Sequence, residues 1–229
     1  MPETTSRPLD VLVAEVIERV FATVEDLHRE TLACHEGALA RGEALTEEDV
    51  HGLAPGIVAR LREPDQVAVG LGLILEPGLL PTHPLRIEWW QWSTTLDEPV
   101  RMEFDLRPDS IGFYDYASTD WFAVPRRTRE RHVVGPYVDV HGTDRYLLTL
   151  TVPIESGGEF LGVAGGDVPL TVFETTILSH TGDAEAAVVN REGRVVLSTS
   201  SRWITGSLVS RAERLRARPL PGLPWSLID

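Results

Sequence analysis

Three candidate β-strands follow one another closely in this chain, joined by very short, glycine-containing links. The strands are residues 133–141, 145–154 and 159–168, and the links are residues 142–144 and 156–158. A parallel connection needs a crossover of about a dozen residues or more, so links of this length join neighbouring antiparallel strands. The run therefore predicts an antiparallel meander and excludes a parallel, doubly wound sheet over this stretch.

Other apolar segments extend this pattern on both sides. Strands are predicted at residues 67–75, 85–92, 100–105, 186–190 and 194–198, and helices at residues 45–61, 118–131 and 170–178. Within the second of these helices, Pro125 is expected to break or restart the helix, because proline has no N–H to donate. The order of elements indicates an α+β fold in which helices pack on an antiparallel sheet.

The N-terminal segment has the periodicity of a long amphipathic helix. Apolar side chains recur at steps of three and four residues at Leu9, Leu12, Val13, Val16, Ile17, Val20, Val24 and Leu27. Such a stripe is ordinarily core packing, and its length would also let it pair with a second subunit. We therefore divide the chain into a long N-terminal helix (1–44), a main domain (45–200), and a C-terminal helix with a Pro- and Arg-rich tail (201–229).

The charge balance limits the possible partners. Asp and Glu total 35 against 21 basic residues, all of them Arg, which gives a formal net charge of −14. Nucleic acids and anionic membranes are bound mainly through basic patches, so neither is expected as a partner. The one basic cluster, at residues 126–131, is interrupted by Glu130 and is interpreted as a solvated helix face.

No segment indicates a membrane or secreted context. No apolar run reaches the roughly 18 residues that a membrane span needs, and the first residues lack the basic-then-apolar pattern of a signal peptide. Cys34 is the only cysteine, which excludes an internal disulfide. We therefore expect a soluble, cytoplasmic protein.

Motifs of catalytic and metal chemistry are missing from the sequence. It contains no G-x-S-x-G elbow, no H-E-x-x-H and no Walker-type glycine loop. His132 and His141 have no third ligand at metal-binding spacing. We expect no metal, no cofactor and no catalytic residue, and therefore a protein that is not an enzyme.

One stretch resembles a known family. It reads FYDYASTDWF (113–122), GPYVDV (135–140), LLTLTVPI (147–154) and FLGVAGGDVPL (160–170). This order and spacing resemble the Cache family of sensor domains, relatives of the PAS fold, over about residues 8–200. The resemblance implies a PAS-like antiparallel sheet with the long N-terminal helix packed across it, and a Cache-like ligand-binding domain over residues 45–200.

The resemblance also implies a ligand site. The pocket signature of the amino-acid-binding members matches Tyr114, Trp121, Tyr137, Asp139 and Asp167. In the family these aspartates, with the aromatic residues, hold a ligand ammonium group. The chemistry is reasonable, because two carboxylates accept charge-assisted hydrogen bonds and an indole face attracts a cation.

The sequence departs from the signature at the position of the family's arginine, which holds the ligand's carboxylate. That position is Thr119 here, two residues before Trp121, so the ammonium half of the site is kept and the carboxylate half is not. A preference for small cationic amines over zwitterionic amino acids follows. The alternative is a carboxylate clamp supplied from elsewhere, with Arg126 or Arg127 the nearest candidates.

Ordinary structural roles compete with each site assignment. Trp121 and Tyr137 could be core aromatics, Asp139 a strand-end carboxylate, and Asp167 a helix N-cap. Our interpretation is a sensor domain that binds a small ammonium-bearing ligand, an amine or an amino acid, and signals through a partner protein or a helix-mediated homodimer. The alternatives are a ligand-free interaction module of the same fold and an enzyme that uses the carboxylate pair.

Overall fold

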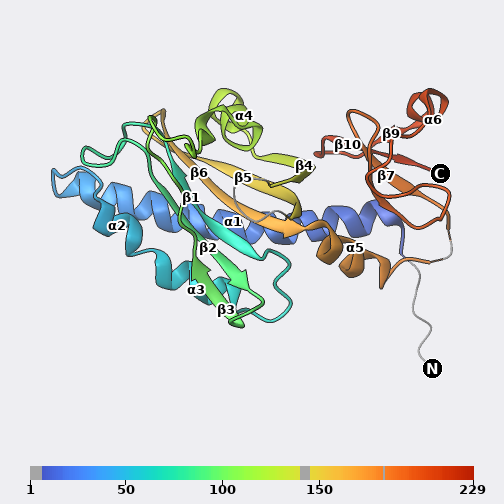
Figure 1. The fold of residues 1–229 in the computed structure, drawn as a ribbon, viewed down its shortest axis with the longest axis horizontal. Coiled ribbons are helices and arrows are strands. Elements are labelled where there is room, and N and C mark those ends of the chain that lie inside the picture. Colours follow the sequence, from blue (N-terminus) through green and yellow to red (C-terminus); the bar gives the residue numbers. More distant parts are fainter. Residues whose placement is uncertain (1–6, 140–144, 183) are drawn as a thin grey trace.

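A six-stranded antiparallel sheet forms the centre of the molecule (Figure 1). The computed structural model describes residues 7–139, 145–182 and 184–229. The strands are β1 (Gly70–Leu75), β2 (Ile87–Ser93), β3 (Glu98–Arg101), β4 (His132–Val138), β5 (Tyr146–Ser156) and β6 (Glu159–Pro169). Their order is β3-β2-β1-β6-β5-β4 with every pairing antiparallel, which confirms the meander. The predicted link at residues 142–144, and His141 before it, lie outside the described residues.

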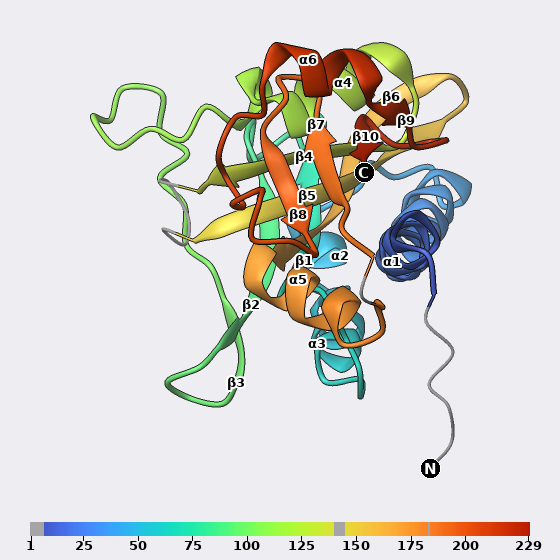
Figure 2. The same cartoon turned by 90° about the vertical axis from the view of Figure 1, so that its right-hand side faces the viewer.

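Helix α1 (Leu9–Ala40) lies across one face of this sheet, against β5 and β6 (Figures 1 and 2). Its 32 residues extend over about 48 Å. The apolar stripe predicted from the sequence is buried in the same protomer, with Val13 and Val24 fully inaccessible to solvent. The stripe is therefore core, and a homodimer through α1 would have to use the other side of the helix.

The remaining helices are short. They are α2 (Glu47–His51), α3 (Ala54–Leu61), a 3₁₀ turn η1 (Tyr116–Ser118), α4 (Asp120–Thr128), α5 (Leu170–Leu178) and α6 (Arg211–Arg216). Helix α5 has the predicted bounds, whereas the predicted break at Pro125 is wrong, because α4 continues through this residue. Among the described residues, no helix is both long and apolar enough to cross a bilayer.

A second, smaller sheet lies at the N-terminal end of α1 (Figure 1). It contains β7 (Ala187–Asn190), β8 (Val195–Ser198), β9 (Arg218–Pro219) and β10 (Trp225–Ile228), in the order β8-β7-β10-β9. The β7–β8 hairpin was predicted, but β10, which the C-terminal tail inserts between β7 and β9, was not. Trp225 packs on Phe173 of α5 at 5.9 Å between ring centroids, and Arg218 pairs with Asp10 of α1 at 3.0 Å. The two sheets therefore share one core.

A β-bulge in β4 determines which side chains of this strand reach the sheet face opposite α1. Val134 pairs with Thr149, but Tyr137 pairs with Leu147, so β4 has one residue more than β5 between these points. Side chains alternate along a regular strand, and one extra residue reverses the alternation. Val134 and Tyr137 consequently both pack against the aromatic cluster on that face, although they are three positions apart and would face opposite sides in a regular strand.

Gly135 lies in the bulge, and Gly135→Ala is expected to destabilise the fold by about 2–4 kcal/mol. Its φ is +121°, and a Cβ there would lie 2.6 Å from the backbone oxygen of Leu147. Thermal unfolding should show a fall in Tm of about 5–15 °C. Gly157→Ala is the matched control, because its φ is +58° but no atom lies within 4 Å of the added Cβ. Equal losses in the two variants would contradict the close contact at Gly135.

Candidate functional site

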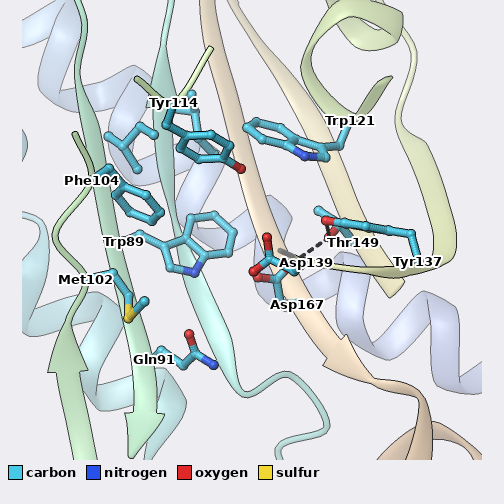
Figure 3. Close-up of a pocket in the computed structure, with 12 residues that line it drawn as sticks. Trp89, Gln91, Met102, Phe104, Tyr114, Trp121, Tyr137, Asp139, Thr149 and Asp167 are labelled. Atoms are coloured by element: carbon cyan, nitrogen blue, oxygen red, sulfur yellow. Dashed lines mark hydrogen bonds between the residues drawn. The ribbon is translucent and has the colours of Figure 1, made fainter. Parts of the chain in front are cut away.

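A pocket opens on the sheet face opposite α1, beneath the segment that contains η1 and α4 (Figure 3). The cavity volume is about 40 Å³, within about 440 Å³ of space that is free of protein atoms and includes open solvent. Its apolar lining is Ile74, Ile87, Trp89, Met102, Phe104, Tyr114 and Trp121, and its polar lining is Gln91, Tyr137, Asp139, Thr149 and Asp167.

The structure brings five of the six predicted site residues together in this pocket. Tyr114, Trp121, Tyr137, Asp139 and Asp167 all line it, and the two aspartate side chains lie next to each other in Figure 3. They come from four different segments of the chain, so only the folded sheet makes them neighbours.

Thr119 is the sixth predicted residue, and it does not line the pocket. It is the N-cap residue of α4, and its hydroxyl donates a 2.6 Å hydrogen bond to the carbonyl oxygen of Tyr116. Its direct contact with a ligand therefore stays a prediction.

Asp167 is the buried carboxylate of the site. Its residue is 8% exposed, and Oδ1 accepts a 2.6 Å hydrogen bond from the Thr149 hydroxyl. Burial raises the pKa of Asp167 to about 7; the Thr149 hydrogen bond lowers it, and the nearby charge of Asp139 raises it. The N-cap of α5 is Pro169, and no side chain caps that helix, so Asp167 is not a helix cap.

A chain of hydroxyl groups connects Tyr137 to Asp167. Tyr137 Oη lies 2.7 Å from Thr149 Oγ1, and Thr149 donates its only proton to Asp167, so Tyr137 donates to Thr149. Burial, with the charge of Asp167, raises the pKa of Tyr137 and keeps its phenol protonated. Sequence reasoning missed Thr149, although its hydroxyl on a mainly apolar strand next to the strand of Asp167 was a usable signal.

Asp139 lies one residue beyond the end of β4 and still follows the strand direction. Its backbone N–H donates to the carbonyl oxygen of Arg145 at 3.0 Å. The bulge described above places Tyr137 on the pocket face, and alternation then places Asp139 on the same face.

Trp121 is fixed by an unusual backbone contact. Pro125 lies four residues later in α4 and has no N–H, so the carbonyl of Trp121 cannot accept the regular helical hydrogen bond. The Thr151 hydroxyl of β5 donates to that carbonyl at 2.9 Å instead. This bond explains both why the helix tolerates Pro125 and why Trp121 is tied to the sheet.

The Trp89 indole packs directly on the backbone of two glycines, Gly72 and Gly165, at the floor of the pocket. A Cβ at Gly72 would lie 2.7 Å from the Trp89 ring, and one at Gly165 would lie 3.3 Å from it. The indole therefore occupies the space that side chains of β1 and β6 would otherwise fill. Close packing of this ring explains why Gly72 and Gly165 have no side chain.

Aromatic rings form the opposite wall. Phe104 stacks on Tyr114 at 5.3 Å between centroids, and Tyr114 lies 6.4 Å from Trp121. Burial, with the charges of Asp139 and Asp167, raises the pKa of Tyr114. Aromatic faces beside two carboxylates attract a cation and offer nothing to an anion.

The alternative carboxylate clamps point elsewhere. Arg126 forms an ion pair with Glu76, and Arg127 is exposed on the last turn of α4. Arg131, from the same basic cluster, pairs with Glu18 of α1 and lies over Phe21, so the cluster is not one solvated face. Within the part of the chain that the structure describes, no basic side chain lines the pocket.

Comparison with known proteins shows which family model and which solved structures this chain resembles. Residues 98–175 match the family model described as "Methyl-accepting chemotaxis protein-like, first PDC sensor domain". The structure titled "Methyl-accepting Chemotaxis protein X" superposes with a TM-score of 0.66 at 12% identity, covering 96% of this chain and 94% of that chain. The chain has a Cache-type sensor fold. The predicted resemblance and the α+β class are thereby confirmed.

Two further solved structures share the Cache-type fold. The Campylobacter jejuni chemoreceptor Tlp3 ligand-binding domain, in complex with L-valine, has a TM-score of 0.56 at 16% identity, covering 96% of this chain and 90% of that one. The extracellular domain of the histidine kinase mmHK1S-Z3 has a TM-score of 0.59 at 15% identity, covering 95% and 93%. Identities this low establish the fold alone.

Proposed function

We propose that this chain is the ligand-binding part of a sensor, that it binds a small ammonium-bearing ligand, and that it prefers amines to amino acids. The observation that supports this most directly is the pairing of Asp139 with Asp167 in an aromatic pocket that no basic side chain of the described residues lines. Such a lining is complementary to one positive charge, and an additional ligand carboxylate would face no counter-charge.

The proposed mechanism is a shift in population on binding, without turnover. Asp167 lies near the end of β6, and α5 begins three residues later at Leu170. Helix α5 in turn carries Phe173, which packs on Trp225 of the second sheet. A ligand that pulls on Asp167 would favour one arrangement of α5 and of the second sheet, which a partner protein would detect.

A matched panel of ligands tests the proposal. Isobutylamine and isovalerate are L-valine without its carboxylate and without its ammonium group, respectively. Isobutylamine at about 100 times its Kd should stabilise the fold by about 2.7 kcal/mol and raise Tm by about 5–10 °C. L-Valine should bind at least tenfold more weakly, and isovalerate should produce no shift.

The panel also separates the competing functions. A response to L-valine or isovalerate with none to isobutylamine would overturn the amine preference and leave the sensor role. No response to any broad set of amines, amino acids and carboxylates would favour the ligand-free interaction module. Recovery of a chemically altered amine after incubation would favour the carboxylate-pair enzyme.

Thr119→Arg tests the residue at which the sequence departs from the family signature. The substitution restores an arginine two residues before Trp121, and we expect the affinity ratio of L-valine to isobutylamine to rise at least tenfold, measured by calorimetry. Thr128→Arg, at the exposed C-terminal end of α4, adds the same charge and serves as the control. An unchanged ratio in Thr119→Arg would remove Thr119 from the site.

Location and assembly complete the proposal. We propose a cytoplasmic location. Fusions of the native gene to reporters that are active only on one side of the membrane test it, and an extracellular arrangement, as in the histidine kinase domain above, is the opposing result.

We also propose a homodimer through the solvent-facing side of α1. A monomer mass by light scattering at all concentrations would contradict it.

A further inference from the structure

The proposed amine site contains a buried polar group for which a simple alkylamine provides no partner. Resting on the proposed function, we propose that Gln91 is a second recognition residue and that the preferred ligand carries, besides its ammonium group, a hydroxyl or N–H donor for the Gln91 amide oxygen.

Gln91 is a buried polar side chain in the pocket wall. It lies on β2, its residue is 5% exposed, and its amide ends beside Met102 and Trp89 in Figure 3. Among the described residues, no hydrogen-bond donor reaches its Oε1. A buried amide oxygen without a partner is unfavourable and uncommon in folded proteins, so an unpaired one in a pocket wall indicates a partner that arrives with the ligand.

Strand pairing places Gln91 and Asp167 on opposite sides of Gly70. Gly70 of β1 is paired with Gln91 on one side and with Asp167 on the other, so the three residues form one row across the sheet. Neighbouring strands lie about 4.8 Å apart, which separates the Cα atoms of Gln91 and Asp167 by roughly 10 Å. Paired positions in a row present their side chains on the same face, here the face of the pocket.

Gly70 has no side chain between the two polar groups, and the edge of the Trp89 indole lies close above it. A Cβ at this position would lie 2.9 Å from Trp89 Nε1 and 3.3 Å from Asp167 Cβ. The route from Asp167 to Gln91 therefore follows the edge of the Trp89 indole, and a bound molecule on this route has its ammonium group at Asp167 and a second polar group at Gln91. After the reach of both side chains is subtracted from the separation of their Cα atoms, the two ligand groups should lie about 4–6 Å apart, which corresponds to a chain of three or four carbons.

The chemistry of Gln91 selects the second group. A carbonyl oxygen accepts hydrogen bonds, so a hydroxyl, an amide N–H or a second ammonium group would satisfy it, whereas a methyl group would leave it unpaired. The ligand class is therefore a short amine with a second hydrogen-bond donor at the far end of its chain.

Matched ligands test this directly. 4-Aminobutan-1-ol and pentylamine have the same number of heavy atoms and the same charge, and they differ only in a terminal hydroxyl against a terminal methyl. We expect calorimetry to give about tenfold tighter binding of the amino alcohol to the unmodified protein. 1,4-Diaminobutane, as a third ligand, distinguishes a hydroxyl from a second ammonium group as the donor.

Two variants identify the residue responsible. Gln91→Met removes the acceptor at similar volume, so the preference for 4-aminobutan-1-ol should disappear while pentylamine still binds. Gln66→Met makes the same change at the other glutamine of the chain, which lies outside the pocket and contacts the backbone of Arg60 and Ala68, and it should retain the preference. Both variants are first checked for cooperative thermal unfolding.

The outcomes separate this inference from the proposed function. Equal or tighter binding of pentylamine to the unmodified protein, or an unchanged preference in Gln91→Met, would overturn the role of Gln91 and leave the amine sensor in place. Binding of none of the three ligands to the unmodified protein would overturn the proposed function, and this inference with it.

Discussion

Replacing Asp167 with asparagine is expected to abolish amine binding and, at the same time, to make the ligand-free protein more stable. The affinity should fall at least 100-fold, because a buried ammonium group would lose a charge-assisted partner. The gain in stability follows from burial, which raises the pKa of Asp167 to about 7 and so makes its ionised form unfavourable in the empty pocket. Asparagine keeps the shape and can still accept the hydrogen bond from Thr149.

The gain should be largest at alkaline pH, where the buried carboxylate is ionised. A pKa displaced from 3.8 to about 7 corresponds to at most about 4 kcal/mol, so the Tm of the ligand-free variant at pH 8 should rise by about 5–10 °C. Asp109→Asn, on an exposed loop, is the control and should change neither property. A variant of Asp167 that binds isobutylamine with unchanged affinity would remove this carboxylate from the site.

Amine affinity is expected to increase with pH, by about 100-fold between pH 5 and pH 8. The ammonium group favours the ionised form of Asp167, so its binding to the protonated pocket must release a proton. Below the pKa of about 7, each unit of pH therefore lowers the affinity about tenfold, and above it the affinity becomes constant. The titratable groups that face Asp167 in the pocket are Asp139, Tyr114 and Tyr137, and both phenols stay protonated throughout this range.

Stability without ligand should change in the opposite direction. The folded state holds a proton on Asp167 that the unfolded chain releases near pH 3.8, so this contribution is complete below pH 3.8 and is lost as pH rises through 7. Calorimetric titrations of isobutylamine in buffers of different ionisation enthalpy would measure the proton released, which should approach one per ligand at pH 6. A release of zero at pH 6, or an affinity that does not change with pH, would contradict the assignment.

The sequence predicted those residues of the site whose spacing along the chain forms a pattern. Tyr114, Trp121, Tyr137, Asp139 and Asp167 were all predicted, because their spacing along the chain carries the family pattern. Gln91 and Trp89 were missed because they belong to β2, whose place beside β1 depends on pairings between distant segments. No pattern within residues 85–92 shows which polar side chain will face the carboxylates.

Two parts of the backbone illustrate the same limit. Alternation along β4 assigns Tyr137 to the α1 side of the sheet when it is counted from Val134, and only the extra residue at Gly135 reverses this. Pro125 predicts a helix break because its effect on a free helix is known, but the hydroxyl that replaces the missing hydrogen bond comes from Thr151 on another element. Rules based on neighbouring residues predicted where most helices and strands lie. The side on which Tyr137 lies and the continuity of α4 at Pro125 depend instead on contacts with other strands.

The position of α1 has a consequence for how the chain reaches its native state. Helix α1 ends at Ala40, yet β5, which covers its apolar stripe, begins only at Tyr146, and the Asp10–Arg218 pair joins residues 208 positions apart. At about 5–20 residues per second, a ribosome needs roughly 5–20 s to make the intervening segment. During that time the stripe lacks the strand that covers it, and closing such long loops makes the final step slow. Helix α1 is therefore expected to expose apolar surface on the nascent chain, where a chaperone can bind it.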